Sequence, residues 1–213
     1  MSERNYYQDL IEIRRMMRKS TRFISLSGLS GILAGLYALI GAFLAHRVMN
    51  SQRVPIIYGQ NIQDYLSNFF EQPVALGLFS IACGVLVASV ITAYLLSHRK
   101  ASKAGEKLWS PAVRRLLRSF LVTLGTGGLF IMVLIQYRLI GLVAPAMLIF
   151  YGLACIHAAK HTLGTVRYLG ITCVILGLIN TQFIGYGLYF WALGFGIAHM
   201  LYGLIMYFKY DCK

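Results

Sequence analysis

The sequence predicts an all-α polytopic membrane protein, a six-transmembrane-helix bundle with an N-terminal amphipathic surface helix. Charged residues make up only 13% of the 213 residues, whereas soluble domains carry roughly a quarter. One run, from Tyr168 to Phe208, contains no Asp, Glu, Lys or Arg over 41 residues. About 20 apolar residues cross the hydrocarbon core of a bilayer. The run is therefore expected to hold two crossings, and the rest of the chain follows the same plan.

Residues 1–22 are expected to form a cytoplasmic basic amphipathic helix. Apolar residues recur there at helical spacing, at Tyr6, Leu10, Ile13 and Met17. The basic residues expected at the membrane surface are Arg14, Arg15, Arg18 and Lys19. Apolar burial and roughly 1 kcal/mol per basic residue favour binding to anionic lipid headgroups. The plainer interpretation is a topology anchor, and the alternative is a docking helix for a cytoplasmic protein partner.

Residues 23–208 are expected to form a single transmembrane domain, followed by a cytoplasmic tail at 209–213. The predicted spans cover 23–45, 74–97, 119–137, 139–157, 166–183 and 184–208. The last two are divided near the polar triplet Asn180-Thr181-Gln182. Ser110-Pro111 predicts that the third helix begins outside the bilayer, because serine caps a helix and proline fits its first turn. Arg138 marks a very tight turn between the third and fourth spans.

Small residues and a proline predict how the spans pack. The first span carries Gly28, Gly31 and Gly35. Of these, Gly31 and Gly35 form a small-xxx-small motif, which lets two helix backbones approach closely in lipid. Pro145 lacks a backbone donor and is expected to bend the fourth span. The glycine-rich, uncharged spans also favour a homo-oligomer.

The basic residues predict the orientation of the chain. With six spans and both termini in the cytoplasm, 17 of the 20 Lys and Arg residues are cytoplasmic, and only Arg47, Arg53 and Arg138 lie outside. This distribution follows the positive-inside rule. The net charge of +13 flanks apolar spans, so anionic headgroups are the expected partners and nucleic acid is not. The outer loop at 47–73 is expected to carry an interfacial helix, with a lid as the functional alternative.

Polar and ionisable side chains within spans are functional candidates, because burying a charge is costly. His157 and His161 are four residues apart, which places them on one helix face if the fourth span continues through them, and His199 lies within the last span. If these histidines converge, they could bind a metal or haem. The plainer interpretation is that His199 hydrogen-bonds a serine, threonine or tyrosine across a helix interface. The remaining candidates for ligand or interface contacts are Asn180, Gln182 and Gln136.

The sequence favours a non-enzymatic module that binds or passes a small or lipidic molecule, and it predicts no catalytic residue and no cofactor. No predicted span contains Asp or Glu, which argues against a cation-coupled pump. The serines within the spans have no evident general base beside them. Two alternatives stay open: a structural or signalling anchor for a cytoplasmic partner, and a histidine-dependent redox or metal-binding subunit.

Three segments carry a family resemblance. They are Arg22-Phe-Ile-Ser-Leu-Ser-Gly-Leu-Ser-Gly31, Gly141-Leu-Val-Ala-Pro-Ala146 and Tyr189-Phe-Trp-Ala-Leu-Gly-Phe-Gly196. The chain resembles, over most of its length, a group of small uncharacterised bacterial six-span integral membrane proteins. The resemblance implies the bacterial inner (cytoplasmic) membrane. That group has no assigned activity, so the resemblance assigns a role to no residue.

Overall fold

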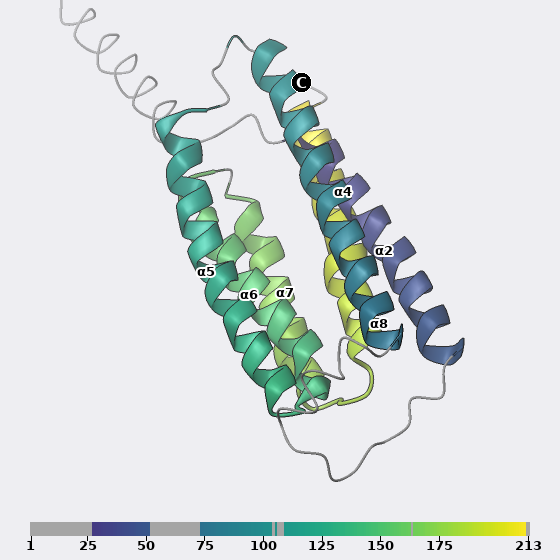
Figure 1. Ribbon diagram of the computed structural model, residues 1–213. Helices are drawn as coiled ribbons and strands as arrows, with labels where there is room; N and C mark the ends of the chain where they lie inside the picture. Colours follow the sequence, from purple (N-terminus) through teal and green to yellow (C-terminus); the bar gives the residue numbers. More distant parts are fainter. Residues whose placement is uncertain (1–26, 52–72, 104, 106–108, 163, 212–213) are drawn as a thin grey trace, which may run out of the picture.

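The chain folds into helices and the connections between them (Figure 1). The computed structural model describes residues 27–51, 73–103, 105, 109–162 and 164–211. Within these ranges there is no strand, and the predicted all-α class is confirmed. The expected surface helix at 1–22 and most of the expected outer-loop segment at 47–73 lie outside the described residues.

Among the residues that the structure describes, five helical stretches are long and apolar enough to cross a membrane, as in a multi-pass membrane protein. They are α2 (Gly28–Ser51), α4 (Pro73–Lys103), α5 (Pro111–Gln136), η1 with α6 (Ile140–Leu142 and Val143–Ala158), and a final rod. The final rod consists of α8 (Gly187–Trp191), η2 (Ala192–Ala198), α9 (His199–Met206) and η3 (Tyr207–Asp211). Between them, α7 (Val166–Asn180) is a shorter apolar helix of 15 residues.

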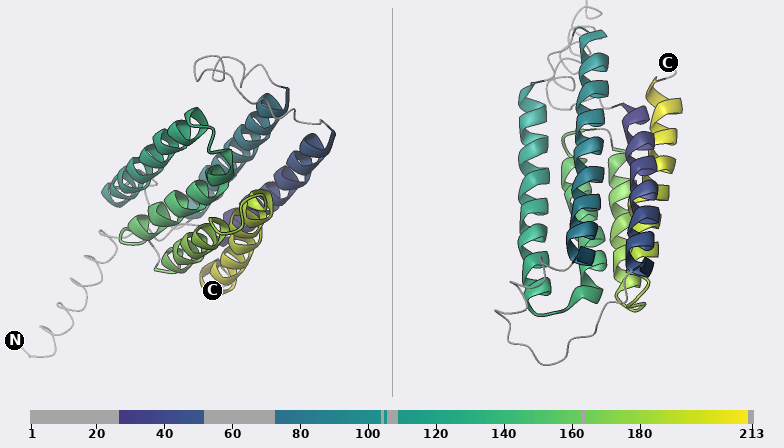
Figure 2. Two further views of the ribbon diagram at one scale, coloured as in Figure 1. Left: turned by 90° about the horizontal axis from the view of Figure 1, so that it is seen from below. Right: turned by 45° about the vertical axis from the view of Figure 1, so that its right-hand side comes forward.

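Consecutive rods are antiparallel, and their axes are nearly aligned (Figures 1 and 2). The packed interfaces form a series: α4 lies on α2, α2 on α9 and η2, η2 on α7, α7 on α6, and α6 on α5. Among the described elements, α4 packs substantially against α2 alone, while α5 packs against α6 and η1. The two ends of the series are therefore α4 and α5, which follow each other in the sequence.

The predicted helix start and turns agree with the structure. The Ser110 hydroxyl accepts a hydrogen bond of 3.3 Å from the Val113 backbone N–H, and Pro111 is the first residue of α5. Arg138 adopts a left-handed conformation with φ of 60° in the short turn between α5 and η1. The helix α7 ends at Asn180 and the final rod begins at Gly187. Local capping and turn chemistry therefore set these boundaries.

The fourth span and the last span are not regular α-helices throughout. A 3₁₀ turn changes to α-helix at Val143, so Pro145 lies in the first turn of α6, where a backbone N–H has no intrahelical partner. The bend predicted at Pro145 depended on a lost backbone hydrogen bond, and a proline in the first turn of a helix loses none. In the final rod, η2 and η3 are π-helical, which widens the turns on either side of α9.

Glycines of α2 bring its backbone against the final rod. A Cβ added at Gly31 would lie 3.0 Å from the Gly203 Cα, and one at Gly35 would lie 2.6 Å from the Gly196 carbonyl oxygen. An added Cβ at Gly28 would lie 2.7 Å from the Gly203 carbonyl oxygen. Such close backbone contact supplies the dispersion energy that holds helices together in lipid. We call this interface the α2–α9 seam.

A second glycine interface joins α6 to α7. A Cβ added at Gly152 would lie 2.5 Å from the Gly170 carbonyl oxygen, and one added at Gly170 would lie 2.6 Å from the Gly152 carbonyl oxygen. The buried residues Cys155 and Cys173 pack beside this contact. Together the two seams fix the positions of α6, α7 and the final rod, which carry the buried polar residues described next.

Candidate functional site

A buried polar centre joins α6 to the final rod through His199 and Tyr151. His199 is 8% exposed. Its Nε2 lies 2.6 Å from the Tyr151 hydroxyl oxygen, and its Nδ1 lies 3.0 Å from the Gly194 carbonyl oxygen. A carbonyl oxygen can only accept, so Nδ1 carries a hydrogen. In the neutral imidazole, Nε2 then accepts a hydrogen bond from the Tyr151 hydroxyl.

The wide turn before His199 sets this geometry. The π-helix η2 ends at Ala198, and the His199 backbone N–H donates to the Gly196 carbonyl. The ring of the same residue donates to the carbonyl of Gly194, five residues earlier in the chain. Both polar ends of the ring are therefore held, one by the backbone of its own rod and one by α6. The hydrogen bond between Tyr151 and His199 fixes α6 relative to the final rod. Each ring nitrogen of His199 already has a hydrogen-bond partner.

Aromatic rings enclose the Tyr151–His199 pair. The Phe195 ring lies 5.0 Å from the Tyr151 ring and 5.9 Å from the His199 ring, measured between centroids. Trp191 contacts Phe195 at 5.2 Å, and Phe120 of α5 contacts Tyr151 at 5.9 Å. Apolar rings around a hydrogen bond exclude water and strengthen it. This arrangement favours a rigid interhelical contact over a metal or haem site.

The structure does not bring His157 and His161 to His199. The Nδ1 of His157 lies 3.0 Å from the Thr123 hydroxyl oxygen of α5, and His161 belongs to the connection between α6 and α7. Across the described residues, no three His, Cys, Asp or Glu side chains form a group that could hold a metal ion. The geometry therefore gives no support to the histidine-dependent alternative.

The three polar candidates at helix ends lie apart from the histidine. Asn180 is fully buried at the end of α7, and neither its Nδ2 nor its Oδ1 has a hydrogen-bond partner among the described residues. Gln182 is exposed and donates to the Thr181 hydroxyl at 3.2 Å. Gln136 is exposed at the last residue of α5. No described contact makes these residues one site.

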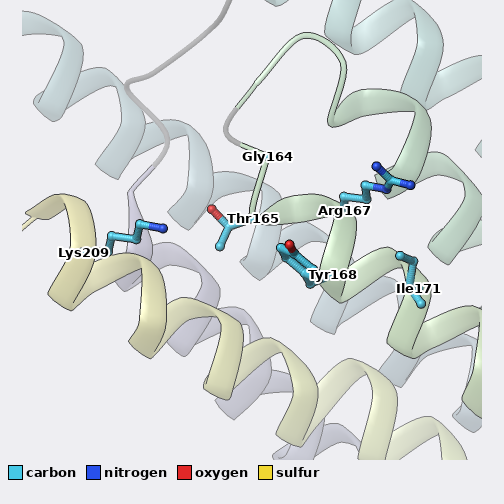
Figure 3. Close-up of a pocket in the computed structure, with 6 residues that line it drawn as sticks. All are labelled: Gly164, Thr165, Arg167, Tyr168, Ile171 and Lys209. Atoms are coloured by element: carbon cyan, nitrogen blue, oxygen red, sulfur yellow. The ribbon is translucent and has the colours of Figure 1, made fainter.

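A pocket at the opposite end of the bundle was not predicted from the sequence. It has a volume of about 610 Å³ and lies where α7 begins, beside the end of the final rod (Figure 3). Its lining residues are Gly164, Thr165, Arg167, Tyr168, Ile171 and Lys209. Lys209 is far from the others in the sequence, so only the antiparallel packing of the rods places it there. The basic residues Arg14, Arg15, Arg18 and Lys19 lie outside the described residues.

No protein-family model, curated protein or solved structure matches this chain. Only its own geometry therefore bears on its function.

Proposed function

We propose that this chain is a six-span protein of the bacterial inner membrane that binds or passes a lipidic molecule without catalysing a reaction. The observation that carries the proposal is the open series of helices. The series ends in α4 on one side and α5 on the other, and α4 packs substantially against α2 alone. A lipidic molecule is proposed to enter from the bilayer between these two helices.

The surface of α4 supports a lipidic rather than an ionic cargo. No residue in the apolar centre of α4 is buried within the protein. The hydroxyls of Ser80 and Ser89 donate to carbonyls of their own helix, each at 2.7 Å. On α5, the Thr126 hydroxyl does the same at 2.9 Å. These hydroxyls donate within their own helices, and the large exposed side chains of α4 and α5 are mostly apolar, so the two helices offer acyl chains an apolar surface.

The count of six spans depends on α7. Its 15 residues rise about 22 Å at the helical pitch, which is less than the roughly 30 Å of a hydrocarbon core. Its direction, opposite to that of α6 and of the final rod (Figure 1), nevertheless carries the chain from one end of the bundle to the other. If α7 is counted as a sixth crossing, each rod begins at the membrane surface where the preceding rod ends.

The orientation is proposed from charge. Among the described residues, nine of the eleven Lys and Arg lie at, or in the connections next to, the helix ends on the side of the bundle where the final rod ends. The other two, Arg47 and Arg138, lie toward the opposite end. The positive-inside rule then places the basic end and both termini in the cytoplasm. A homo-oligomer in which a second copy covers α4 and α5 is the competing arrangement, because it would close the route between these helices.

Reconstitution into liposomes tests the proposal. We expect the full-length protein to accelerate the exchange of a fluorescent phospholipid between leaflets, measured by dithionite quenching, without releasing a trapped ion indicator. Gly84→Trp in α4 and Gly128→Trp in α5 enlarge open positions and are expected to slow the exchange at least severalfold. Ile175→Trp, on the exposed face of α7, is the matched control. If exchange stays at the protein-free rate and no lipid remains bound after purification, the proposal is wrong.

A further inference from the structure

We propose that the pocket at the start of α7 is a binding site for the phosphate headgroup of an anionic phospholipid of the leaflet at the basic end. This inference goes beyond the cargo proposed for the opening between α4 and α5. It concerns a different part of the molecule, and either proposal can fail without the other.

The charge of the pocket selects an anion. Arg167 and Lys209 line it, and Figure 3 shows Lys209 extending from the final rod toward Thr165, while Arg167 extends from α7 on the side away from Lys209. All the lining residues lie between Glu106 and Asp211, a stretch of sequence that contains no Asp or Glu. Two cations that line one opening make the local potential positive, which attracts a phosphate group. Basic pockets between transmembrane helices are the usual headgroup sites of anionic lipids.

The backbone adds to this charge. Helix α7 begins at Val166, and its N-cap residue Thr165 makes no side-chain capping bond. The start of a helix carries about half a unit of positive charge, which favours a phosphate at that position. The Thr165 hydroxyl donates to the Met206 sulfur at 3.6 Å, which is a weak acceptor. A phosphate oxygen within reach would be a stronger acceptor for the same hydrogen.

The pocket also has an apolar side, which points to a lipid rather than to a soluble phosphate. Tyr168 is 71% exposed and Ile171 is 37% exposed, and they follow the basic start of α7 toward the middle of the helix. An exposed tyrosine beside basic residues is typical of the membrane–water interface. A volume of about 610 Å³ accommodates a glycerophosphate headgroup, while acyl chains continue along the outward face of α7.

Lipid binding to the delipidated full-length protein tests the site, measured by native mass spectrometry in a non-ionic detergent at low salt. We expect dioleoyl phosphatidylglycerol to bind at least about tenfold more tightly than dioleoyl phosphatidylcholine. Each basic residue near a headgroup contributes about fivefold in affinity. The variant Arg167→Gln with Lys209→Gln is therefore expected to lose about 30-fold in phosphatidylglycerol affinity.

Matched variants separate this site from general surface charge. Arg114→Gln with Arg115→Gln removes two exposed charges from the start of α5, at the same end of the bundle, and is expected to change the affinity by no more than about twofold. Arg167→Lys with Lys209→Arg keeps both charges and is expected to retain binding. Circular dichroism and gel filtration establish that every variant is folded.

Three outcomes would overturn the proposal. The variant Arg167→Gln with Lys209→Gln could retain the preference for phosphatidylglycerol. Alternatively, this variant and the control Arg114→Gln with Arg115→Gln could lose the preference equally. In addition, glycerol 3-phosphate or inorganic phosphate could displace the lipid at equal concentration, which would identify the pocket as a site for a soluble anion. Loss of lipid exchange in the Gly84→Trp and Gly128→Trp variants, with phosphatidylglycerol affinity intact, would show that the two sites are separate.

Discussion

Glycines of the α2–α9 seam and the outward-facing glycines of α4 and α5 have opposite surroundings. At Gly203, an added Cβ would lie 2.8 Å from the Gly28 carbonyl oxygen and would also meet the backbone nitrogen of Ile32. At Gly84, Gly125 and Gly128, nothing lies within 4 Å of the added atom. In the seam, the missing side chain permits contact between two backbones. At these three positions of α4 and α5, the same residue type leaves an open surface, whereas Gly77 and Gly127 of the same helices pack against the side chains of Val48 and Phe150.

The difference shows that glycine content does not by itself locate a helix interface. In lipid, apolar side chains gain little by leaving the bilayer, so close backbone contact is what stabilises a pair of helices. Only the three-dimensional position of a glycine tells whether it provides that contact. Substitutions in the two regions can therefore confirm or break the comparison, and we order them by the size of the expected effect.

The largest effect is expected for Gly203→Leu in the α2–α9 seam. The new side chain would meet the backbone of α2, which cannot rotate away as a side chain could. Overpacking of this kind typically costs up to about 3 kcal/mol in the free energy of unfolding. Unfolding of the protein in mixed micelles, followed by circular dichroism, measures the change. A loss below about 1 kcal/mol would mean that the seam is looser than the structure shows.

An intermediate effect is expected for Tyr151→Phe at the buried polar centre. The change removes the hydroxyl that lies 2.6 Å from His199 Nε2 and leaves that nitrogen buried without a partner. Hydrogen bonds between membrane helices contribute on average about 0.6 kcal/mol and at most about 1.7 kcal/mol, so a loss in that range is expected.

A double-mutant cycle isolates this bond from the rest of the tyrosine. The cycle combines Tyr151→Phe with His199→Leu and should return a coupling energy of similar size. Tyr186→Phe, at a tyrosine that is 59% exposed, is the control and should leave stability unchanged. Equal losses in the two tyrosine variants would count against a structural role for the Tyr151–His199 pair.

The smallest effect is expected for Gly84→Leu and Gly128→Leu on the outer helices. Both side chains enter open space, and leucine favours helix over glycine by about 0.8 kcal/mol. Stability is therefore expected to stay level or rise slightly. Light scattering on the same samples reports the oligomeric state. A clear loss of stability together with dissociation would show that a second copy covers these helices and that the surface is not open.

Much of the fold followed from local chemistry in the sequence. Ser110 and Pro111 mark a helix start because capping involves neighbours three residues away. Arg138 marks a turn because almost no chain is available between two long apolar runs. The division of the final stretch into two rods, α7 and the final rod, followed from the length of the uncharged run that begins at Tyr168. These features depend on short distances along the chain, which is why one sequence suffices to predict them.

The candidate sites were less predictable because they depend on distances across the bundle. A tyrosine partner was one expectation for His199, but nothing in the sequence singled out Tyr151 among 14 tyrosines. The π-helical course of η2 has no simple sequence pattern, and it directs the His199 ring onto the Gly194 carbonyl. The pocket required Lys209 to lie beside the start of α7, which is a consequence of tertiary packing. The sequence also did not show that a change from 3₁₀ to α-helix would place Pro145 in a first turn.

The π-helical stretch η2 changes how the last rod responds to a change of chain length. A π turn holds more residues than an α turn, so deleting one residue between 192 and 198 lets the segment return to regular α-helix and keeps His199 facing Tyr151 and Gly203 against α2. Within α9, which is regular, a deletion instead rotates every later side chain by about 100°. We therefore expect the rod to tolerate the loss of one residue before His199 and to misfold when one is lost after it.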